Sequence, residues 1–591
     1  MYFRLRAHRC RGLVLVRHLC LVCLFLPLAA ASGSEKTSDL SLKTFRGQPW
    51  SLDDVRDSKL VVVAFLGTEC PLAKLYGPRL QQLHSEFTGK GVAFVGVNSN
   101  TQDSVTEIGA YVARCGISFP MIKDVGNKAA DLLKAERTPE VFVLDQQRKV
   151  RYRGRVDDQY LVGLARDKVS RRDLAIAIEE LLADKTVSVA RTEAIGCHIG
   201  RVKETVPHGE ITYSKHIAPI FNSRCVECHR SGEIAPFQLT GYEDVLGWED
   251  TILEVIQENR MPPWFANPKH GTFSNDARLS VAEKRLIKSW VSNGMPEGNK
   301  ADLPGPPEFV EGWRMAEPDQ VIKIRDRPFT VQAEGVVDYQ YFEVDPKWDE
   351  DRYVVAAEAR PENVAVVHHI IAYVIEPGSN GRRGQDRRML VGYAPGSIPH
   401  VLDEGTAIHV KAGSKLVFEM HYTPNGTQQT DLSYIGLKFT DKANVKRLLR
   451  GGAAIETKFR IPANERSYSV EATATMKNDQ MLLEMTPHMH LRGKAFRYEA
   501  IYPGGRREIL LDVPNYDFNW QLTYKLNEPK LLKKGTVIKC TATYDNSKHN
   551  LVNPNPDEIV GWGDQSDQEM MIGFFTTVPP QKSTAKTASL D

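Results

Sequence analysis

The spacing of hydrophobic and polar positions changes three times along the 591-residue chain. Between residues 39 and 185, apolar runs typical of buried strands alternate with stretches of helical spacing. Strands are predicted at residues 60–66, 92–97, 141–144 and 150–155, and helices at 72–87 and 171–182. Buried strands that alternate with helices indicate an α/β layer structure.

The remainder of the chain divides into a helical and a β-rich part. Residues 186–207 are predicted to be a linker, and residues 208–300 are helical with few strand signals. A proline-rich stretch at 301–307 marks the next boundary. From about 318 to 578, short β-rich runs broken by Gly, Pro and Asn predict one or two antiparallel β-sandwiches. The predicted fold class is therefore multidomain: an α/β domain, a small all-α domain and all-β sandwiches.

Composition excludes several classes of protein. Hydrophobic residues make up 42% and charged residues 25%, which argues against a mainly disordered or polytopic membrane protein. The formal net charge of +2 argues against broad binding to nucleic acid, which needs a concentrated basic face.

The N-terminus has the order of a secretory signal peptide. Residues 1–17 carry five arginines and no acid, residues 19–31 are apolar, and Ala29-Ala30-Ala31 is a small-residue cleavage signal. Cleavage after Ala31 would give a periplasmic or secreted chain that is not transmembrane, because the apolar run is too short and is broken by proline. The alternative is an uncleaved N-terminal anchor.

One cysteine of the α/β region has the position of a reactive thiol. Cys70 follows the first strand and opens the next helix, where the helix dipole and free N–H groups stabilise a thiolate. Thr138-Pro139 precedes the third strand, and a cis proline there could pack beside the thiol. Cys115 is a possible resolving partner, and Cys197 has no assignment.

Residues 39–185 resemble the redoxin branch of the thioredoxin-like fold. The strand order, the position of Cys70 and the Thr-Pro dipeptide carry the resemblance. The sequence departs from that pattern because residues 70–73 read Cys-Pro-Leu-Ala, without the second cysteine of CxxC. Val63 also stands where the peroxiredoxin motif has proline. Cys70 is therefore interpreted as a thiol-redox residue, with a remnant cysteine in a docking domain as the alternative.

The helical region contains a C-x-x-C-H motif at Cys225, Cys228 and His229. Thiols three residues apart share a helix face, and the adjacent histidine can reach an iron, so the motif predicts one covalent haem c. Residues 208–300 resemble a monohaem cytochrome c domain. Met261, in the loop before a predicted helix at 281–291, is the expected sixth ligand, and Met295 and His270 are weaker candidates. The competing interpretation is a zinc site completed by Cys197-His198.

Histidines and one methionine form further candidate ligand sets in the β-rich region. His488 and His490 are two residues apart, so on a strand they share one face. His368 and His369 are adjacent and can bind one ion only at a twisted or terminal position, with His421 as a possible third ligand. Imidazole suits copper and thioether favours Cu(I). An all-histidine set, and a second set that includes Met570, therefore predict two copper ions.

The order of these motifs resembles the copper type II, ascorbate-dependent monooxygenases. The likeness covers about 318–578 and includes the histidine pair, residues 392–396 (Gly-Tyr-Ala-Pro-Gly), His421-Tyr422, the HxHLxGK stretch from His488, and Glu569-Met570. The resemblance implies two jelly-roll-like β-domains, at 318–455 and 456–580, with one copper each. It assigns the electron-transfer copper to His368, His369 and His421, and the oxygen-binding copper to His488, His490 and Met570.

Other positions depart from that family. Met571 stands where a cysteine usually follows the methionine ligand. Thr486, Ile572 and Phe574 replace the Arg, Asn and Tyr of the peptide-amidating members, so a peptide carboxylate is not the expected substrate.

The predicted function is copper-dependent hydroxylation of a C–H bond of an organic substrate by O2. An ascorbate-like reductant or a redox protein would supply electrons, with the haem and redoxin domains as electron-transfer and thiol-redox modules. Two alternatives remain open: an electron-transfer or copper-handling protein without hydroxylase activity, and a thiol peroxidase with accessory metal domains.

Overall fold

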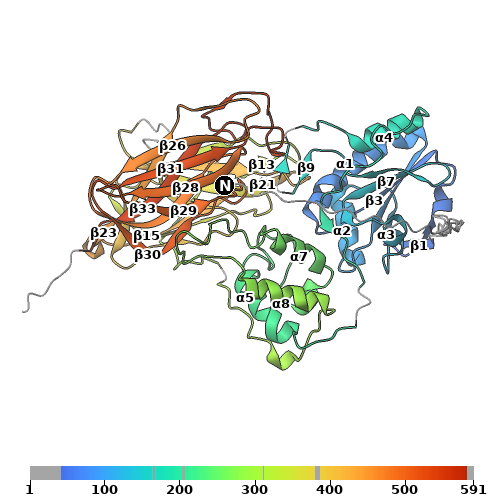
Figure 1. Cartoon of the computed structure of the whole chain (residues 1–591), viewed down its shortest axis with the longest axis horizontal. Coiled ribbons are helices and arrows are strands. Elements are labelled where there is room, and N and C mark those ends of the chain that lie inside the picture. The colour runs from blue at the N-terminus through green and yellow to red at the C-terminus, as the bar shows by residue number, and fades with distance from the viewer. Residues whose placement is uncertain are drawn as a thin grey trace, which may run out of the picture.

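The computed structural model describes residues 41–162, 164–166, 168–202, 206–310, 312–379 and 387–581. The predicted signal peptide, residues 1–31, lies outside the described residues. An α/β part and a β-rich part lie at opposite sides of the molecule, with a helical part beneath and between them (Figure 1). None of the helices in the described ranges is long and apolar enough to cross a membrane.

The α/β part is built on one seven-stranded sheet with the order β2-β1-β5-β4-β3-β7-β8. Within it, β3 runs parallel to β4 and antiparallel to β7. Every residue of β3 is buried, as expected for a continuous apolar run in the middle of a sheet covered on both faces. The strands are β1 (Ser41–Thr44), β2 (Pro49–Ser51), β3 (Leu60–Phe65), β4 (Val92–Asn98), β5 (Met121–Lys123), β7 (Glu140–Leu144) and β8 (Val150–Gly154).

Helices complete this α/β part. They are α1 (Pro71–Phe87), α2 (Val105–Cys115), α3 (Lys128–Leu133) and α4 (Asp173–Leu182). The four predicted strands and two predicted helices are confirmed to within two residues at each end. The sequence analysis missed α2, although Ser104 and Glu107 form a capping box at its start.

The predicted linker at 186–207 contains a short strand. β11 (Cys197–His198) pairs antiparallel with β6 (Arg137–Thr138) of the α/β part. The Ile199 N–H donates to the Glu136 carbonyl oxygen at 2.9 Å. This segment is therefore fixed against the α/β part.

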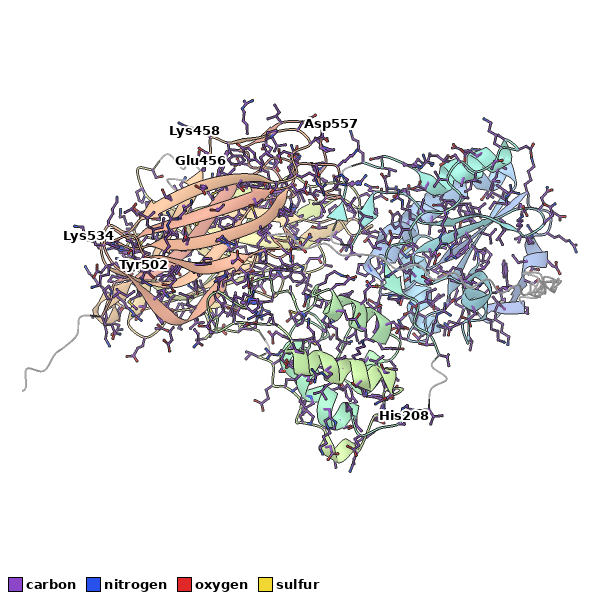
Figure 2. The ribbon with its side chains drawn as sticks, in the orientation of Figure 1. His208, Glu456, Lys458, Tyr502, Lys534 and Asp557 are labelled. Carbon is purple, nitrogen blue, oxygen red and sulfur yellow. The ribbon has the colours of Figure 1, made fainter. Side chains whose placement is uncertain are left out.

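The helical part comprises η4 (Tyr213–Ile217), α5 (Ala218–Arg224), α6 (Tyr242–Val245), α7 (Glu249–Gln257) and α8 (Val281–Ser292). His208 lies at its edge (Figure 2). The predicted closing helix at 281–291 is confirmed as α8. The loop between α7 and α8 leaves this core, however, because Trp264 and Phe273 are buried in the core of the second β-sandwich. Their rings contact Tyr524 at centroid distances of 4.9 and 5.6 Å.

The first β-sandwich packs two sheets around one core. One sheet has the order β12-β22-β15-β19-β23, with β18 paired to β15, and the other β14-β20-β16-β17. The strands are β12 (Gln320–Lys323), β14 (Gln340–Val344), β15 (Arg352–Arg360), β16 (Val367–Ile375), β17 (Arg387–Tyr393), β18 (His400–Val401), β19 (Thr406–Val410), β20 (Lys415–Tyr422), β22 (Tyr434–Phe439) and β23 (Arg447–Leu448).

The second β-sandwich has sheets of order β24-β33-β27-β30 and β26-β31-β28-β29 around its own core. The strands are β24 (Arg450–Glu456), β26 (Tyr468–Thr475), β27 (Gln480–His488), β28 (Gly493–Ile501), β29 (Arg507–Val513), β30 (Tyr524–Leu532), β31 (Val537–Tyr544) and β33 (Met571–Val578). A mostly-β C-terminal region is thereby confirmed. The predicted boundary at 455/456 falls inside β24, which pairs with β33 along its full length.

Candidate functional site

The Cys70 thiol lies where strand β3 of the α/β sheet passes into helix α1. Cys70 caps the N-terminus of α1, and Pro71 occupies the first helical position, where its missing N–H costs nothing. In its thiol form, Sγ donates to the Thr138 carbonyl oxygen at 2.8 Å. The Thr138–Pro139 peptide is cis. Cys70 is 1% exposed, so the sulfur is covered by neighbouring chain.

Cys197 supplies part of that cover. It is the register partner of Thr138 in the β11–β6 pair. Cys197 lies close enough to Cys70 for its side chain and backbone to lower the pKa of the Cys70 thiol. The approach requires glycine at the preceding position, because a Cβ on Gly196 would lie 2.0 Å from the Thr138 carbonyl oxygen. The two sulfurs are thus held together by a close backbone contact.

The pKa values of the two thiols are shifted in opposite directions. Burial raises the pKa of Cys70, but hydrogen bonds from Cys197 and from the Ala73 backbone outweigh it and bring the pKa to about 6. The pKa of Cys197 lies well above its ordinary value, because its thiol proton is shared with Cys70 and because it is buried. At neutral pH, Cys70 is therefore a thiolate and Cys197 the thiol that donates to it.

Cys115 is not brought to Cys70. A Cβ on Gly77 would lie 2.6 Å from the Cys115 sulfur, so Cys115 packs against α1 at Gly77. Seven residues along a helix correspond to about 10 Å. The geometry therefore argues against Cys115 as the possible resolving partner of Cys70. The sequence offered Cys197 only as an unassigned cysteine and as an alternative zinc ligand, and no local signal pairs it with Cys70.

Three predicted metal ligands of the first β-sandwich meet at one point. Metal-binding atoms of His368, His369 and His421 lie within 4.8 Å of one another. His369 and His421 are register partners on β16 and β20, and the register shifts between Val367 and His369. That β-bulge is the irregular position that adjacent histidines need in order to face one point.

The other predicted set lies at the edge of the second sandwich. The rings of His488, at the end of β27, and His490 are 5.2 Å apart. His488 Nδ1–H donates to Gln521 Oε1 at 2.7 Å, and His490 Nδ1–H donates to the Gln568 carbonyl oxygen at 3.2 Å. Met570 lies two residues after Gln568, so it belongs to the segment that contacts His490.

These histidines have the protonation state of metal ligands. Burial lowers the pKa of His368 and of His488 to about 4 and that of His490 to about 3, and it also lowers the pKa values of His369 and His421. All five are neutral at pH 7, which is the form that binds metal. Three buried ring nitrogens in the described part of the chain have no hydrogen-bond partner: His369 Nε2, His421 Nδ1 and His490 Nε2. Such donor atoms suit a metal ion.

Two aromatic residues that the sequence analysis missed lie between the two sets. The Tyr339 ring is 4.7 Å from that of His421 and 6.2 Å from that of His490. The Phe518 ring is 5.9 Å from the rings of both His368 and His490. The two ligand sets therefore face each other across the contact between the sandwiches. Sequence spacing gave no sign of this contact.

The C-x-x-C-H motif lies in turns, which differs from the predicted helix face. α5 ends at Arg224, and the Cys228 and His229 N–H groups both donate to the Cys225 carbonyl oxygen. His229 Nδ1–H donates to the Phe237 carbonyl oxygen at 3.0 Å, which leaves Nε2 as its metal-binding atom. This hydrogen bond suits a haem ligand. Met261 lies in the turn after α7, and its role as sixth ligand stays a prediction.

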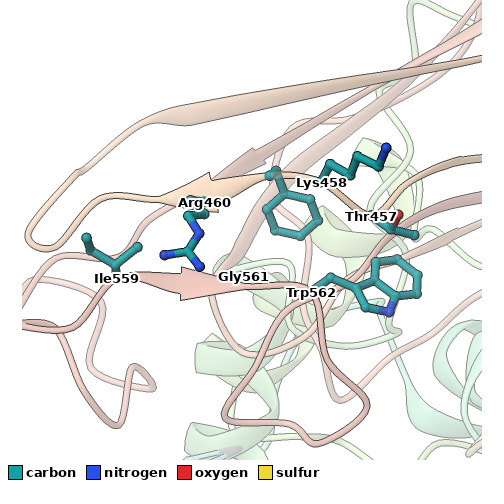
Figure 3. A pocket seen from close by; sticks show the side chains of 7 residues that line it. Thr457, Lys458, Arg460, Ile559, Gly561 and Trp562 are labelled. Carbon is teal, nitrogen blue, oxygen red and sulfur yellow. The ribbon is translucent and has the colours of Figure 1, made fainter.

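An open pocket of about 590 Å³ lies on the ribbon formed by β25 (Arg460–Ile461) and β32 (Val560–Gly561). Figure 3 shows the Trp562 ring and the Lys458 and Arg460 side chains along it. Lys458 and Asp557 both lie along the upper edge of the β-rich part (Figure 2). The Gly561 carbonyl oxygen accepts from the Glu569 N–H at 3.1 Å. This hydrogen bond joins Gly561, which lines the pocket, to Glu569, the residue that precedes Met570.

A family model decides the nature of the α/β part. The AhpC/TSA family matches residues 34–153. The N-terminal domain is a thioredoxin-like redoxin domain. The family model ends at residue 153, so the helical and β-rich parts lie outside it.

Curated relatives of the redoxin domain are thiol-redox proteins by name. The thiol-disulfide oxidoreductase ResA of Halalkalibacterium halodurans is 25% identical over 126 residues, which are 21% of this chain and 70% of the relative. The thioredoxin-like protein YneN of Bacillus subtilis is 28% identical over 114 residues, 19% of this chain and 65% of the relative. A hypothetical protein of Sinorhizobium meliloti 1021, known from a crystal structure, is 30% identical and covers 28% of this chain and 93% of its own, with a TM-score of 0.26.

Proposed function

We propose that this chain is an oxidoreductase that exchanges thiols and disulfides through Cys70. The observation that carries the proposal is the environment of its sulfur, at a helix N-terminus and hydrogen-bonded by Cys197. A thiolate at neutral pH is the nucleophile in such exchange. The relative named thiol-disulfide oxidoreductase supports the same chemistry for the redoxin domain.

The test is reduction of the insulin disulfides by the mature chain with dithiothreitol as the final reductant. Cys70→Ser should abolish the rate above background, and Cys115→Ser should retain it, because Cys115 packs away from the site. The assay needs a Cys225→Ala/Cys228→Ala background as well, since these thiols, when free, can exchange. A Cys70→Ser chain that keeps its rate in this background would refute the proposal. Turnover of hydrogen peroxide by the same variants tests the thiol peroxidase alternative.

A second function is favoured by four buried histidines and one half-buried histidine, His368. We propose that His368, His369 and His421 would hold one copper ion, and that His488, His490 and Met570 would hold another. The support is the three buried ring nitrogens that have no hydrogen-bond partner among the described residues, together with the neutral state of every imidazole. Copper bound there would supply one-electron redox chemistry for hydroxylation of a C–H bond by O2.

The surrounding residues would orient these ligands and exclude water. Gln521 and the Gln568 carbonyl accept the Nδ1 protons, which fixes Nε2 as the free nitrogen of His488 and His490. Glu569 accepts the His490 N–H at 2.9 Å and so holds the segment that leads to Met570. The Tyr339 ring closes the space between the sets.

The C-x-x-C-H motif lies beside the first sandwich. Glu227, inside the motif, forms an ion pair with Arg314 at 2.8 Å, and Arg314 also donates to the Ser397 carbonyl oxygen of the first sandwich. We propose that Cys225, Cys228 and His229 would hold one haem c there as an electron-transfer group. A neighbouring module of this kind would lower the need for a diffusible reductant such as ascorbate.

Metal and haem analysis of the mature chain tests this second proposal. Two copper ions and one covalent haem are expected, with one copper lost in His368→Ala and the other in His490→Ala. Stoichiometric zinc or iron in place of copper would refute it. O2 consumption coupled to product, with ascorbate present, separates a monooxygenase from a copper-handling protein.

We also propose a periplasmic or secreted location, which the N-terminal sequence supports and which suits both covalent haem and thiol exchange. N-terminal sequencing of the mature chain should start at Ser32. A chain that keeps Met1 and stays in the cytoplasm would refute the location.

A further inference from the structure

Cys197 has no role in the redoxin resemblance, yet the fold places it on Cys70. It reaches this position from the segment after the redoxin domain, through β11. Its side chain packs against the cores of both the redoxin domain and the helical part. Cys197 thus supplies, from a distant segment, the second thiol that the Cys-Pro-Leu-Ala motif lacks.

The position of Cys197 is fixed from both sides. Arg137 donates to the Gly196 carbonyl oxygen and to Glu254, each at 2.7 Å. His198 Nε2 lies 2.7 Å from the same Glu254 carboxylate of α7, and the His198 N–H donates to Thr251 Oγ1 at 3.1 Å. The segment that carries Cys197 is therefore held by hydrogen bonds to β6 on one side and to α7 on the other.

We propose that Cys70 and Cys197 form the redox pair of this chain and cycle between a dithiol and a disulfide. This inference rests on the proposed exchange function of Cys70. The substrate class is an external dithiol, or in the reverse direction its disulfide. The cycle needs no second cysteine within the Cys-Pro-Leu-Ala motif.

The exchange balances as follows. One external thiolate attacks the Cys197 sulfur, which is the more exposed of the two, and the Cys70–Cys197 bond breaks. Cys70 leaves as a thiolate, as the thiol of lower pKa should. The second external thiolate then attacks its partner's sulfur, and Cys197 leaves and takes up a proton. The external dithiol has lost two electrons and two protons. The two electrons now reside on the Cys70 thiolate and the Cys197 thiol, one proton is on Cys197, and the other proton has gone to solvent.

Trypsin separates every relevant cysteine of the redoxin and helical parts. Cys70 falls in residues 60–74, Cys115 in 115–123, Cys197 in 192–201, and Cys225 with Cys228 in 225–230. The full chain is oxidised with glutathione disulfide, blocked with iodoacetamide and digested without reductant. Mass spectrometry should find peptide 60–74 linked to 192–201, with the link lost on reduction. A link from 60–74 to 115–123 or to 225–230, or no link to 60–74, would overturn the proposal.

Turnover separates this inference from the proposed function. In insulin reduction, Cys197→Ala should lose turnover and accumulate glutathione on Cys70 when glutathione disulfide is present, whereas Cys115→Ala should match the parent chain. If Cys70→Ser is inactive but Cys197→Ala is fully active, the pair is wrong and the exchange function stands. If Cys70→Ser is active, the exchange function itself fails.

Discussion

Removal of the Cys197 thiol should make Cys70 a weaker acid. In the parent chain the pKa of Cys70 is about 6, although burial alone raises it, and the Cys197 side chain is the first of the groups that lower it. Cys197→Ala removes that donor and keeps the backbone N–H. A hydrogen bond to a charged group contributes about 1.5–3 kcal/mol, and one pKa unit corresponds to about 1.4 kcal/mol. The expected rise is therefore about one to two units.

The effect is large enough to measure near neutral pH. With a pKa of about 6, about nine-tenths of Cys70 is thiolate at pH 7. A pKa raised to about 7–8 leaves between about a tenth and a half. The assay is ultraviolet thiolate absorbance of the reduced chain against pH, with the absorbance of the matching Cys70→Ala variant subtracted so that only Cys70 contributes.

Cys197→Ser is the matched control, because its hydroxyl can still donate to the Cys70 sulfur. It should keep most of the low pKa. If the pKa of Cys70 rises as far in the serine variant as in the alanine variant, the cause is solvent entry or altered packing rather than the lost hydrogen-bond donor. If Cys197→Ala leaves the Cys70 midpoint unchanged or lowers it, Cys197 does not stabilise the thiolate, and the inferred geometry of the pair is refuted.

Four further outcomes follow from the same contacts. The folded pKa of Cys70 lies below 9.0 and that of Cys197 lies above it. The contribution of the pair to the free energy of unfolding should therefore rise from pH 6 to about 9 and fall at higher pH. Denaturant titrations of the parent chain and of the double alanine variant measure this contribution. Gly196→Ala should displace β11 and abolish the linked peptide in mass spectrometry, because its Cβ would meet a backbone oxygen at 2.0 Å. Glu254→Gln should shift the equilibrium between dithiol and disulfide by less than about 1 kcal/mol, measured against glutathione, because its ion pairs are partly exposed. His490→Ala should lose one copper by elemental analysis and keep the redox pair intact, whereas loss of both metals would show that the two sets form a single site.

The redoxin core was predictable because its strands are covered on both faces. Such strands appear in the sequence as uninterrupted apolar runs, and β3 and β4 each match the predicted range to within one residue. Cys70 could be found because its signal is local: a strand, a cysteine and a helix in sequence.

Cys197 could not be predicted from a local pattern. β11 has two residues, which is too short for a period of two to show. Its partner strand lies about 60 positions earlier in the chain. The pairing depends on tertiary contacts of Gly196 in the linker and Arg137 on β6, and neither residue stands out in the sequence. The same holds for Tyr339, whose place between two histidine sets depends on how two sandwiches pack.

The histidine pair shows an intermediate case. The alternation of side chains on a strand required an irregular position if His368 and His369 were to share a site, and the register shift beside His369 supplies one. The sequence could state that condition but not whether it is met, because a bulge is a property of two paired strands. Residue type can therefore suggest candidate ligands, whereas the convergence of their atoms requires the fold.

The helical part links the two chemistries in space. On one side, Glu254 of α7 holds the segment that carries Cys197. On the other, Glu227 of the C-x-x-C-H motif is paired with Arg314 beside the first sandwich. Formation of a Cys70–Cys197 bond would draw β11 toward α1. The contacts of Glu254 with Arg137 and His198 would then change. The Glu254 carboxylate is thus one contact that joins the Cys197 segment to α7. Glu254→Gln tests whether this contact transmits the thiol state to the C-x-x-C-H motif, with the five histidines left unchanged.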